Sequence, residues 1–256
     1  MKSLYNNTEI YNLFDTEAKY QNVKKHWEKL LEGKDIHSFL DVSYGTGSLT
    51  LPLAELGVSL YGSDLTPSML ASGEKKAQKK GLPIQLRQCD FRKLTEHFTE
   101  TFDCVGSTGN SLPYVSNEEI PHVLEQMDSL IKKGGYLYYD MRNWDKILSQ
   151  RNRFYLYDPV FVDDVRVNLV QVWDYHPDDT MTFHLLYTFE RDGKVFQKEH
   201  FEEHYYPVKR NLLLNKLKEM GYTDIQIRCH PAQFDKIDPQ QADWYCVIAK
   251  KDPDNF

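Results

Sequence analysis

The sequence has few cysteines and no long apolar stretch. Its 256 residues contain four cysteines, and none of these are spaced as metal ligands are. We expect them to be buried free thiols, as in a reducing cytoplasm, and we expect no metal. No run approaches the roughly 18 apolar residues of a membrane-spanning helix, and the first residues contain no apolar signal core. We therefore expect a cytoplasmic protein without a membrane partner.

Positive charge is also scarce. The chain has 31 lysines and arginines against 38 acidic residues, a net charge of −7, and no basic run. Nucleic-acid backbones are bound through lysine and arginine, so we expect no nucleic-acid partner. Tyrosine, in contrast, is abundant, with 17 residues. Its ring and hydroxyl suit a pocket for a small polar ligand, although strand surfaces account for most of these tyrosines.

The length fits one large domain with an insertion. Residues 1–37 form an amphipathic segment that we predict to be helical, in which Tyr5, Tyr11 and Phe14 are expected to fold over a pocket as a lid. Residues 38–150 alternate strands with helices, which is the pattern of a parallel, doubly wound sheet. The fifth of these strands is predicted at 136–140, after a helix at 117–132 that ends at two glycines.

Residues 151–207 break this alternation. Three strands are predicted at 165–173, 180–190 and 195–205, and turn sequences separate them, so we expect an antiparallel insertion. Residues 208–256 then supply a helix and the last two strands of the core sheet, at 224–229 and 244–249. The expected fold is α/β, with a seven-stranded, mostly parallel sheet and an antiparallel β insertion after the fifth strand.

Polar residues follow the first strands of this sheet. Asp41, Asp64, Asp90 and Asn110 lie at or just beyond four strand ends, where ligands bind in open α/β sheets. Asp64 follows Gly47 at a spacing that suits an acid accepting both ribose hydroxyls. Asp90 and the neighbouring phenylalanine can bind and stack an adenine. These positions predict a nucleoside site, in which the glycines of the first loop let the backbone approach the ligand.

NAD and S-adenosylmethionine (SAM) are the two candidates for this site. A pyrophosphate needs a third glycine after Gly47, and the chain has Thr50 at that position. The carboxylate of Asp41 repels a pyrophosphate but attracts an ammonium group. The loop therefore favours SAM, which carries an α-amino group and no phosphate.

The run DVSYGTG, from Asp41 to Gly47, resembles the first motif of class I SAM-dependent methyltransferases. Further segments resemble glycine N-methyltransferase and bacterial glycine/sarcosine N-methyltransferases: GNS at 109–111, DMRNWDKIL at 140–148, LYT at 186–188 and YYP at 205–207. The resemblance covers roughly residues 11–250. It implies a Rossmann-like methyltransferase fold with SAM as the cofactor and S-adenosylhomocysteine as the product.

The resemblance also implies roles for individual residues. Arg142 is expected to bind the carboxylate of the substrate with help from Asn110, although Arg142 could instead pair with Asp140 or Asp145, and Asn110 could instead cap a turn. Tyrosines at 157, 187 and 205 or 206 are expected to line the amine pocket, and we predict Tyr157, Tyr187 and Tyr206 as the substrate-binding tyrosines. The expected cofactor-binding residues are Tyr11, Tyr20, Asp41, Ser43, Gly45, Gly47, Asp64, Leu65, Asp90, Phe91, Thr108 and Tyr114.

The chain departs from this family pattern at three places. Tyr44 occupies a position where a cysteine is often found, so we expect it to crowd or cap the cofactor. No arginine occurs in residues 1–86 to meet the carboxylate of SAM, which leaves Lys19, Tyr11 or Tyr20 as substitutes. Tyr114 stands where the family has a histidine.

The predicted function is transfer of a methyl group from SAM to the amine of a small amino acid such as glycine or sarcosine. One alternative is methylation of another small amine, carboxyl or hydroxyl group, and another is a SAM-binding sensor without turnover. No general base is evident, since lone histidines such as His122, His184, His200 and His204 are more often structural.

Overall fold

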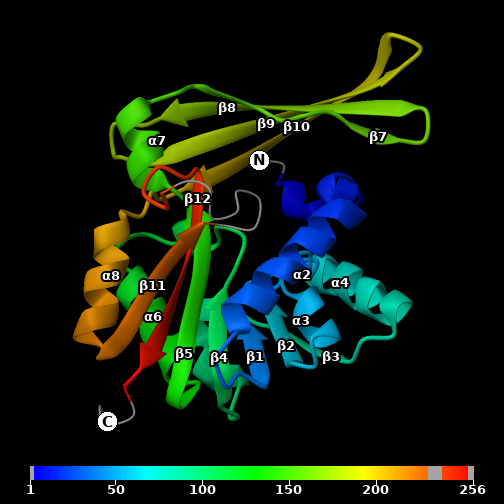
Figure 1. The fold of residues 1–256 in the computed structure, drawn as a ribbon. Coiled ribbons are helices and arrows are strands. Elements are labelled where there is room, and N and C mark those ends of the chain that lie inside the picture. Colours follow the sequence, from blue (N-terminus) through cyan, green and yellow to red (C-terminus); the bar gives the residue numbers. More distant parts are fainter. Residues whose placement is uncertain (1–2, 230–237, 253–256) are drawn as a thin grey trace.

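Two β-sheets, one above the other in Figure 1, make up most of the fold. The computed structural model describes residues 3–229 and 238–252. Residues 1–2, 230–237 and 253–256, which belong to the predicted segments 1–37 and 208–256, lie outside the described residues.

The larger sheet has seven strands in the order β11-β12-β5-β4-β1-β2-β3. The pairs β1–β2, β1–β4, β2–β3 and β4–β5 are parallel, and β12 runs antiparallel to both β5 and β11. The predicted fold class is therefore confirmed. The strand bounds are β1 Ser38–Asp41, β2 Ser59–Asp64, β3 Ile84–Gln88, β4 Phe102–Ser107, β5 Ile131–Arg142, β11 Tyr222–Cys229 and β12 Trp244–Lys251.

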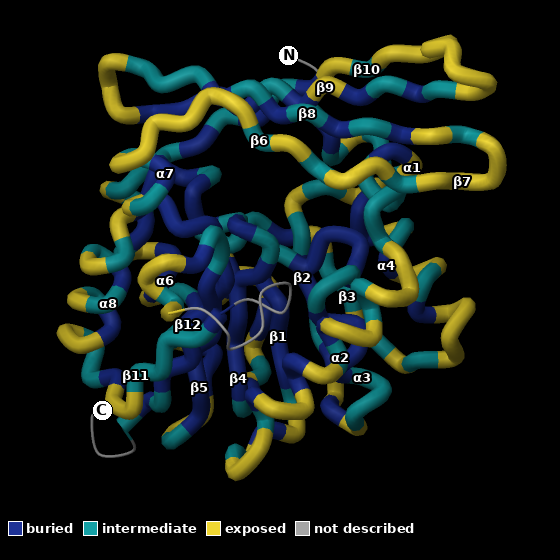
Figure 2. The backbone as a smooth tube through the Cα atoms, turned by 45° about the horizontal axis from the view of Figure 1, so that its top comes forward, coloured by how far each residue is buried: buried dark blue, intermediate teal, exposed yellow. Residues whose placement is uncertain are grey.

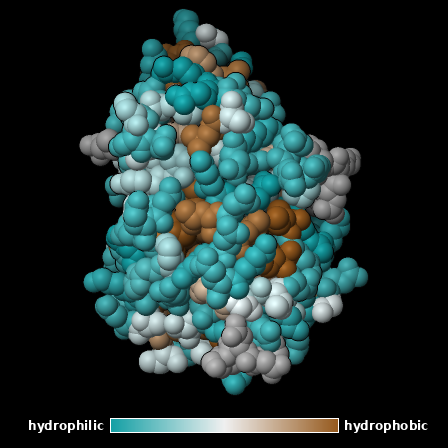
Figure 3. All heavy atoms as spheres, turned by 90° about the vertical axis from the view of Figure 1, so that its left-hand side faces the viewer, coloured by the Kyte–Doolittle hydropathy of each residue, from teal (hydrophilic) through white to brown (hydrophobic). Residues whose placement is uncertain are grey.

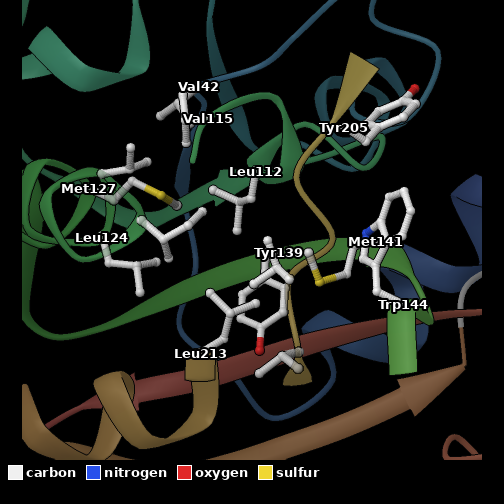
Figure 4. Close-up of a cluster of buried hydrophobic side chains, with 14 of the residues drawn as sticks. Val42, Leu112, Val115, Leu124, Met127, Tyr139, Met141, Trp144, Tyr205 and Leu213 are labelled. Atoms are coloured by element: carbon white, nitrogen blue, oxygen red, sulfur yellow. The ribbon is translucent and has the colours of Figure 1, made fainter. Parts of the chain in front are cut away.

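Helices cover both faces of this sheet, because successive strand residues point to opposite sides. Phe39 packs in one apolar cluster with residues of α2, α3 and α4, while its neighbour Leu40 packs in another with residues of α6 and α8. Figure 4 shows part of the second cluster. The helices are α1 Thr8–Tyr11, α2 Glu17–Leu31, α3 Leu51–Glu55, α4 Pro67–Lys80, α5 Leu94–His97, α6 Ile120–Asp128, α7 Trp144–Gln150 and α8 Arg210–Glu219, with short 3₁₀ turns η1 Leu4–Asn6, η2 Asn12–Phe14, η3 Phe91–Lys93 and η4 Leu112–Tyr114.

The smaller sheet is antiparallel and lies across the carboxyl ends of the parallel strands (Figure 1). It consists of β6 Phe154–Leu156, β7 Val160–Val162, β8 Val165–Tyr175, β9 Met181–Arg191 and β10 Lys194–Tyr205. Its three long strands match the predicted ones, and β6 and β7 were not predicted. The ends of its hairpins are exposed, whereas the strands of the larger sheet are mostly buried (Figure 2). Seen from the side of α8, the surface is mostly hydrophilic, with a hydrophobic band across its middle (Figure 3).

One predicted boundary is wrong. The helix expected at 117–132 covers only Ile120–Asp128, and β5 begins at Ile131, before the two glycines. The pairing of β4 with β5 shifts register between Phe102 and Cys104, and Gly134 has a φ of +70°. A Cβ on Gly135 would lie 2.8 Å from the backbone oxygen of Asp103. The glycine pair therefore forms a bulge inside a long strand rather than the end of a helix.

The N-terminal segment is helical only in part. Helix α2 begins after Thr16, whose hydroxyl accepts a hydrogen bond from the backbone N–H of Lys19 at 3.2 Å. The residues before it form the short elements η1, α1 and η2. Asn7 interrupts them with its side chain, which accepts a hydrogen bond from the N–H of Ile10.

Candidate active site

The loop after β1 is held by a buried carboxylate. Asp41 has no exposed surface, and it accepts hydrogen bonds from the N–H of Ser43 at 3.1 Å and from the hydroxyls of Thr50 at 2.9 Å and Thr108 at 2.8 Å. Burial raises the pKa of Asp41 to about 6, against the effect of these donors. Asp41 therefore ties the glycine loop to the end of β4.

Asp64, at the end of β2, fixes the same loop from the other side. Its carboxylate accepts the N–H of Gly45 at 2.9 Å and the N–H of Thr66 at 2.8 Å. Burial raises its pKa above the usual range. Gly45 has a φ of +56°, which favours glycine, and the hydroxyl of Tyr11 lies 3.9 Å from the position a Cβ would take there.

Asp64 lines a cleft of about 330 Å³. Six residues expected to bind the cofactor share this cleft: Ser43, Asp64, Leu65, Asp90, Phe91 and Tyr114. It is also lined by residues that were not predicted as cofactor-binding, among them Ser3, Tyr5, Arg92, Ser111 and Glu203. A volume of this size matches small-ligand sites in proteins.

Arg92 controls the ionisation of Asp90. Its guanidinium donates to Asp90 at 2.7 Å and to Glu119 at 2.8 Å. The hydrogen bonds from Arg92 lower the pKa of Asp90, so this carboxylate is an ionised acceptor at the edge of the cleft. Arg92 was not among the predicted site residues, although its position two residues after Asp90 is visible in the sequence.

Tyr44 does not reach this cleft. Its side chain is only 3% exposed and fills a space left by three glycines. A Cβ would lie 2.3 Å from the hydroxyl oxygen of Tyr44 at Gly47, 2.7 Å from its ring at Gly62, and 2.6 Å from its ring at Gly73. The expectation that Tyr44 crowds or caps a ligand in the cleft is therefore corrected, because the ring points into the core under the loop.

Tyr20 and Gly47 line a different cavity, of about 370 Å³, together with Lys76. The hydroxyl of Tyr20 donates to Glu55 at 2.7 Å. The ammonium group of Lys76 donates to Asp15 at 2.7 Å and to the hydroxyl of Thr46 at 2.9 Å in the glycine loop. Lys76 thus supports the loop, whereas Lys19 is bonded to Asp15 at 2.7 Å.

Arg142 is a buried cation at the end of β5. It is 5% exposed, and its guanidinium donates to the hydroxyl of Tyr157 at 2.9 Å and to Gln171 at 3.3 Å. Four aromatic rings, those of Tyr155, Trp173, Phe183 and Trp244, surround it at 4.9–5.5 Å from their centres. Within residues 3–229 and 238–252, no carboxylate forms an ion pair with it. The alternative pairing with Asp140 or Asp145 is therefore not found in this structure.

Asn110 positions the end of β5. It has a φ of +63°, and its side-chain oxygen accepts the N–H of Arg142 and the indole N–H of Trp144, both at 3.1 Å. The N–H of Gly109 donates to Asp140 at 2.8 Å, and burial raises the pKa of Asp140 to about 7. The side-chain oxygen of Asn110 therefore binds the end of β5 and the start of α7, and not a group of the turn in which Asn110 lies.

The predicted tyrosines differ in their surroundings: Tyr157 is hydrogen-bonded to Arg142, and Tyr205 is linked through Tyr114 to the cleft. Phe14 of η2 contacts the rings of both Tyr157 and Tyr187, with centroid distances of 5.9 and 6.3 Å. Tyr205 packs on Trp144 at 5.4 Å (Figure 4). Tyr206 instead packs on His204 at 5.3 Å, away from these rings.

A chain of hydroxyl groups connects Tyr205 with the cleft. The Tyr114 hydroxyl lies 2.7 Å from that of Tyr205, 2.8 Å from that of Tyr5 and 3.3 Å from a carboxylate oxygen of Glu203. Glu203 also accepts the backbone N–H of Leu4 at 2.8 Å, and burial raises its pKa. The N-terminal segment is thereby attached to β10.

Arg142 and Asp64 line separate cavities. Arg142 borders a small cavity of about 160 Å³ with Tyr155 and Trp173, and none of its lining residues also line the cleft at Asp64. Phe14 contacts the tyrosines near Arg142, while Tyr11 of the same segment lies over the glycine loop.

Known proteins resemble this chain in both sequence and structure. Residues 39–135 match a family described as a methyltransferase domain. A glycine/sarcosine N-methyltransferase from Aphanothece halophytica is 26% identical over 252 residues, which cover 94% of this chain and 86% of the relative. The structure of a SAM-dependent methyltransferase from Clostridium acetobutylicum superimposes with a TM-score of 0.74 at 20% identity, covering 96% of this chain and 97% of the other.

The chain is a SAM-dependent methyltransferase. The expected enzyme class and family resemblance are thus confirmed, and SAM is the cofactor of this class. A SAM-bound amino pentose methyltransferase from Micromonospora echinaspora also shares the fold, with a TM-score of 0.72 at 13% identity over 95% of both chains.

The substrate of the methyltransferase is a small molecule, as in its relatives. None of the helices in the described ranges is both long and apolar enough to cross a membrane. All four cysteines are buried thiols, as predicted.

Proposed function

We propose that the enzyme methylates the amine of a small amino acid such as glycine or sarcosine. The observation that carries this proposal is Arg142, a buried cation enclosed by aromatic rings without a carboxylate partner among the described residues. Burying a charge is costly unless a counter-ion compensates it. A substrate carboxylate supplies that counter-ion, and a guanidinium binds a carboxylate through two parallel hydrogen bonds.

The cleft at Asp64 fits SAM in charge. SAM carries a sulfonium and an ammonium group and no phosphate, and the cleft is lined by Asp64, Asp90 and Glu203. Asp64 would hold the ribose, Asp90 and Phe91 the adenine, and the loop at Gly45 the amino-acid part. When bound, SAM supplies an electrophilic methyl group, so the protein needs no covalent intermediate.

The remaining task of the protein is to orient the acceptor and remove its proton. Arg142 holds the carboxylate, its guanidinium donates to the hydroxyl of Tyr157, and Phe14 connects Tyr157 with Tyr187 through ring contacts. An amine must be neutral to act as a nucleophile. We propose that its proton passes along the hydroxyl groups of Tyr205 and Tyr114 to the carboxylate of Glu203. Burial raises the pKa of Glu203, which favours its acceptance of a proton.

The N-terminal segment would act as the lid in this scheme. Its Tyr11 lies over the glycine loop, and its Phe14 packs on Tyr157, which is hydrogen-bonded to Arg142, and on Tyr187. In this proposal Phe14 moves aside, so that the substrate at Arg142 and the methyl group of SAM share one space. Exclusion of water would then strengthen the interactions with the bound substrate.

A panel of acceptors tests the proposal. Release of S-adenosylhomocysteine is measured with glycine, sarcosine, dimethylglycine, an amino sugar, and carboxyl and hydroxyl acceptors. The proposal predicts the highest kcat/KM with an amino acid that carries a free carboxylate. A clear preference for the amino sugar or for a carboxyl or hydroxyl acceptor contradicts it and supports the alternative substrates.

A further inference from the structure

A cluster of histidine and carboxylate side chains lies on the face of the smaller sheet that points away from the core. In β10, Phe201, Glu203 and Tyr205 are buried, so His200 and Glu202, which alternate with them, point outward. In β9, His184 lies between the buried residues Phe183 and Leu185 and also points outward.

Strand register brings these side chains together. Glu202 is the direct partner of His184 across the β9–β10 pair, and His200 is its diagonal neighbour two residues earlier. Facing residues and diagonal neighbours on one side of a sheet are within reach of each other. The cluster is on the opposite face of β10 from Glu203 and Tyr205, so it is separate from the candidate active site.

The three potential ligand atoms have the spacing of a metal site. Nδ1 of His184 lies 3.1 Å from Nε2 of His200 and 3.4 Å from Oε1 of Glu202, and the last two atoms are 3.8 Å apart. A tetrahedral zinc ion with bonds of about 2.0–2.2 Å requires ligand atoms about 3.3–3.6 Å apart. Small side-chain adjustments bring the three atoms to these distances, and the fourth position stays open to water.

A second carboxylate orients one of the histidines. Nε2 of His184 lies 3.1 Å from Asp174 on β8, and Asp174 is itself paired with Arg153. With Nε2–H donating to Asp174, a neutral His184 directs its Nδ1 lone pair toward His200 and Glu202. Histidine ligands of metal ions commonly donate their other N–H to a carboxylate in this way.

Without a bound cation, the cluster contains a contact between two hydrogen-bond acceptors. In that tautomer the Nδ1 lone pair of His184 faces the carboxylate of Glu202, which is an acceptor as well. A divalent cation bound by both groups converts this repulsive contact into ligation. A second proton on His184 would satisfy the same groups, and the experiment below distinguishes metal binding from protonation of His184.

We propose that His184, His200 and Glu202 form a binding site for a divalent transition-metal ion such as Zn²⁺. Two imidazoles and one carboxylate are ligands that zinc prefers. The ion would join β9 to β10 and stabilise the smaller sheet. This inference departs from the expectations that the chain binds no metal and that these histidines are structural.

Titration with Zn²⁺ and Co²⁺ tests the site. The full chain is prepared without an affinity tag, treated with a chelator, and titrated by calorimetry with Zn²⁺ and by visible absorption with Co²⁺. We expect about one equivalent to bind, with a visible spectrum typical of low-coordinate cobalt. His200→Gln and Glu202→Gln should each weaken binding at least tenfold, and Asp174→Asn by about ten- to a hundredfold.

His204→Gln is the matched control. His204 lies on the same strand and face but outside the three ligands, so its substitution should leave metal binding and thermal unfolding unchanged. Because His200 is half exposed, its variant should fold, and circular dichroism verifies this. Three results would each overturn the proposal: no metal binding by the unsubstituted chain, equal binding by His200→Gln, or loss of binding only in His204→Gln. The first of these would indicate that a second proton on His184 satisfies the cluster.

Discussion

Tyr44 and Gly73 are predicted to be strongly coupled in stability. A Cβ on Gly73 would lie 2.6 Å from a ring carbon of Tyr44, a distance that real Cβ atoms do not adopt. Gly73 lies inside helix α4, where alanine would otherwise be favoured. The position therefore carries glycine because the ring of Tyr44, and not the helix, requires it.

The sizes of the effects follow from these contacts. Gly73→Ala should cost about 1–3 kcal/mol through overpacking, offset by about 1 kcal/mol of helix propensity. Tyr44→Ala leaves a cavity and should cost about 3–5 kcal/mol by analogy with other large aromatic truncations. Once the ring is absent, Gly73→Ala should become neutral or stabilising, with part of the gain opposed by a backbone carbon of Thr46 at 3.2 Å. The expected coupling is about 1–3 kcal/mol.

Urea unfolding of the two single variants, the double variant and the unsubstituted chain measures this coupling. Tyr44→Phe is the matched control, because it keeps the ring and removes only a hydroxyl that has no hydrogen-bond partner in the described structure. Gly73→Ala should cost the same in the Tyr44→Phe background as in the unsubstituted chain, so the coupling of this control pair should be close to zero. Additivity of Tyr44→Ala and Gly73→Ala within about 0.5 kcal/mol would refute the packing argument.

Three further predictions concern ionisable groups. Glu203→Gln should lower kcat at saturating SAM, with the loss shrinking as pH rises, because free amine then forms without a proton acceptor; a constant loss across a pH–rate profile argues against the relay. Burial raises the pKa of Asp41 to about 6 and of Asp140 to about 7, so the folded state holds protons that the unfolded state has released, and the free energy of unfolding should fall as pH rises from about 4 to 7. Urea titrations across that range measure this, and a rise in stability contradicts it. Asp64→Asn should weaken SAM binding by roughly tenfold or more, since charge-assisted hydrogen bonds contribute about 1.5–3 kcal/mol; unchanged affinity in calorimetry would remove Asp64 from the cofactor site.

Much of the fold could be predicted because strand patterns and strand-end residues are local features. Asp64 and Asp90 follow apolar runs directly, so their location at one edge of the sheet follows from parallel topology alone. The two glycines before residue 136 misled the prediction because they are equally typical of a helix end and of a bulge.

Tertiary contacts explain what the sequence could not show. Glu203 meets Leu4 across 199 positions, and only the fold brings β10 over the N-terminal segment. The direction of the Tyr44 ring depends on glycines in three separate elements. The sequence likewise could not show whether Arg142 pairs with Asp140 or Asp145, since both acids lie close to it along the chain.

The proposed methylation of a small amino acid depends most directly on Arg142 as the carboxylate-binding group. The decisive measurement compares kcat/KM for glycine and glycinamide in the unsubstituted enzyme and in Arg142→Met, with SAM affinity measured in parallel. Tyr157 and Gln171 are hydrogen-bonded to each other at 3.3 Å, and the variant keeps both residues, so the space around the side chain at position 142 should keep its shape. We predict that the enzyme prefers glycine by about a hundredfold, as expected for charge-assisted hydrogen bonds of about 3 kcal/mol, and that the variant loses this preference while binding SAM normally. An undiminished preference for glycine in Arg142→Met would contradict the account.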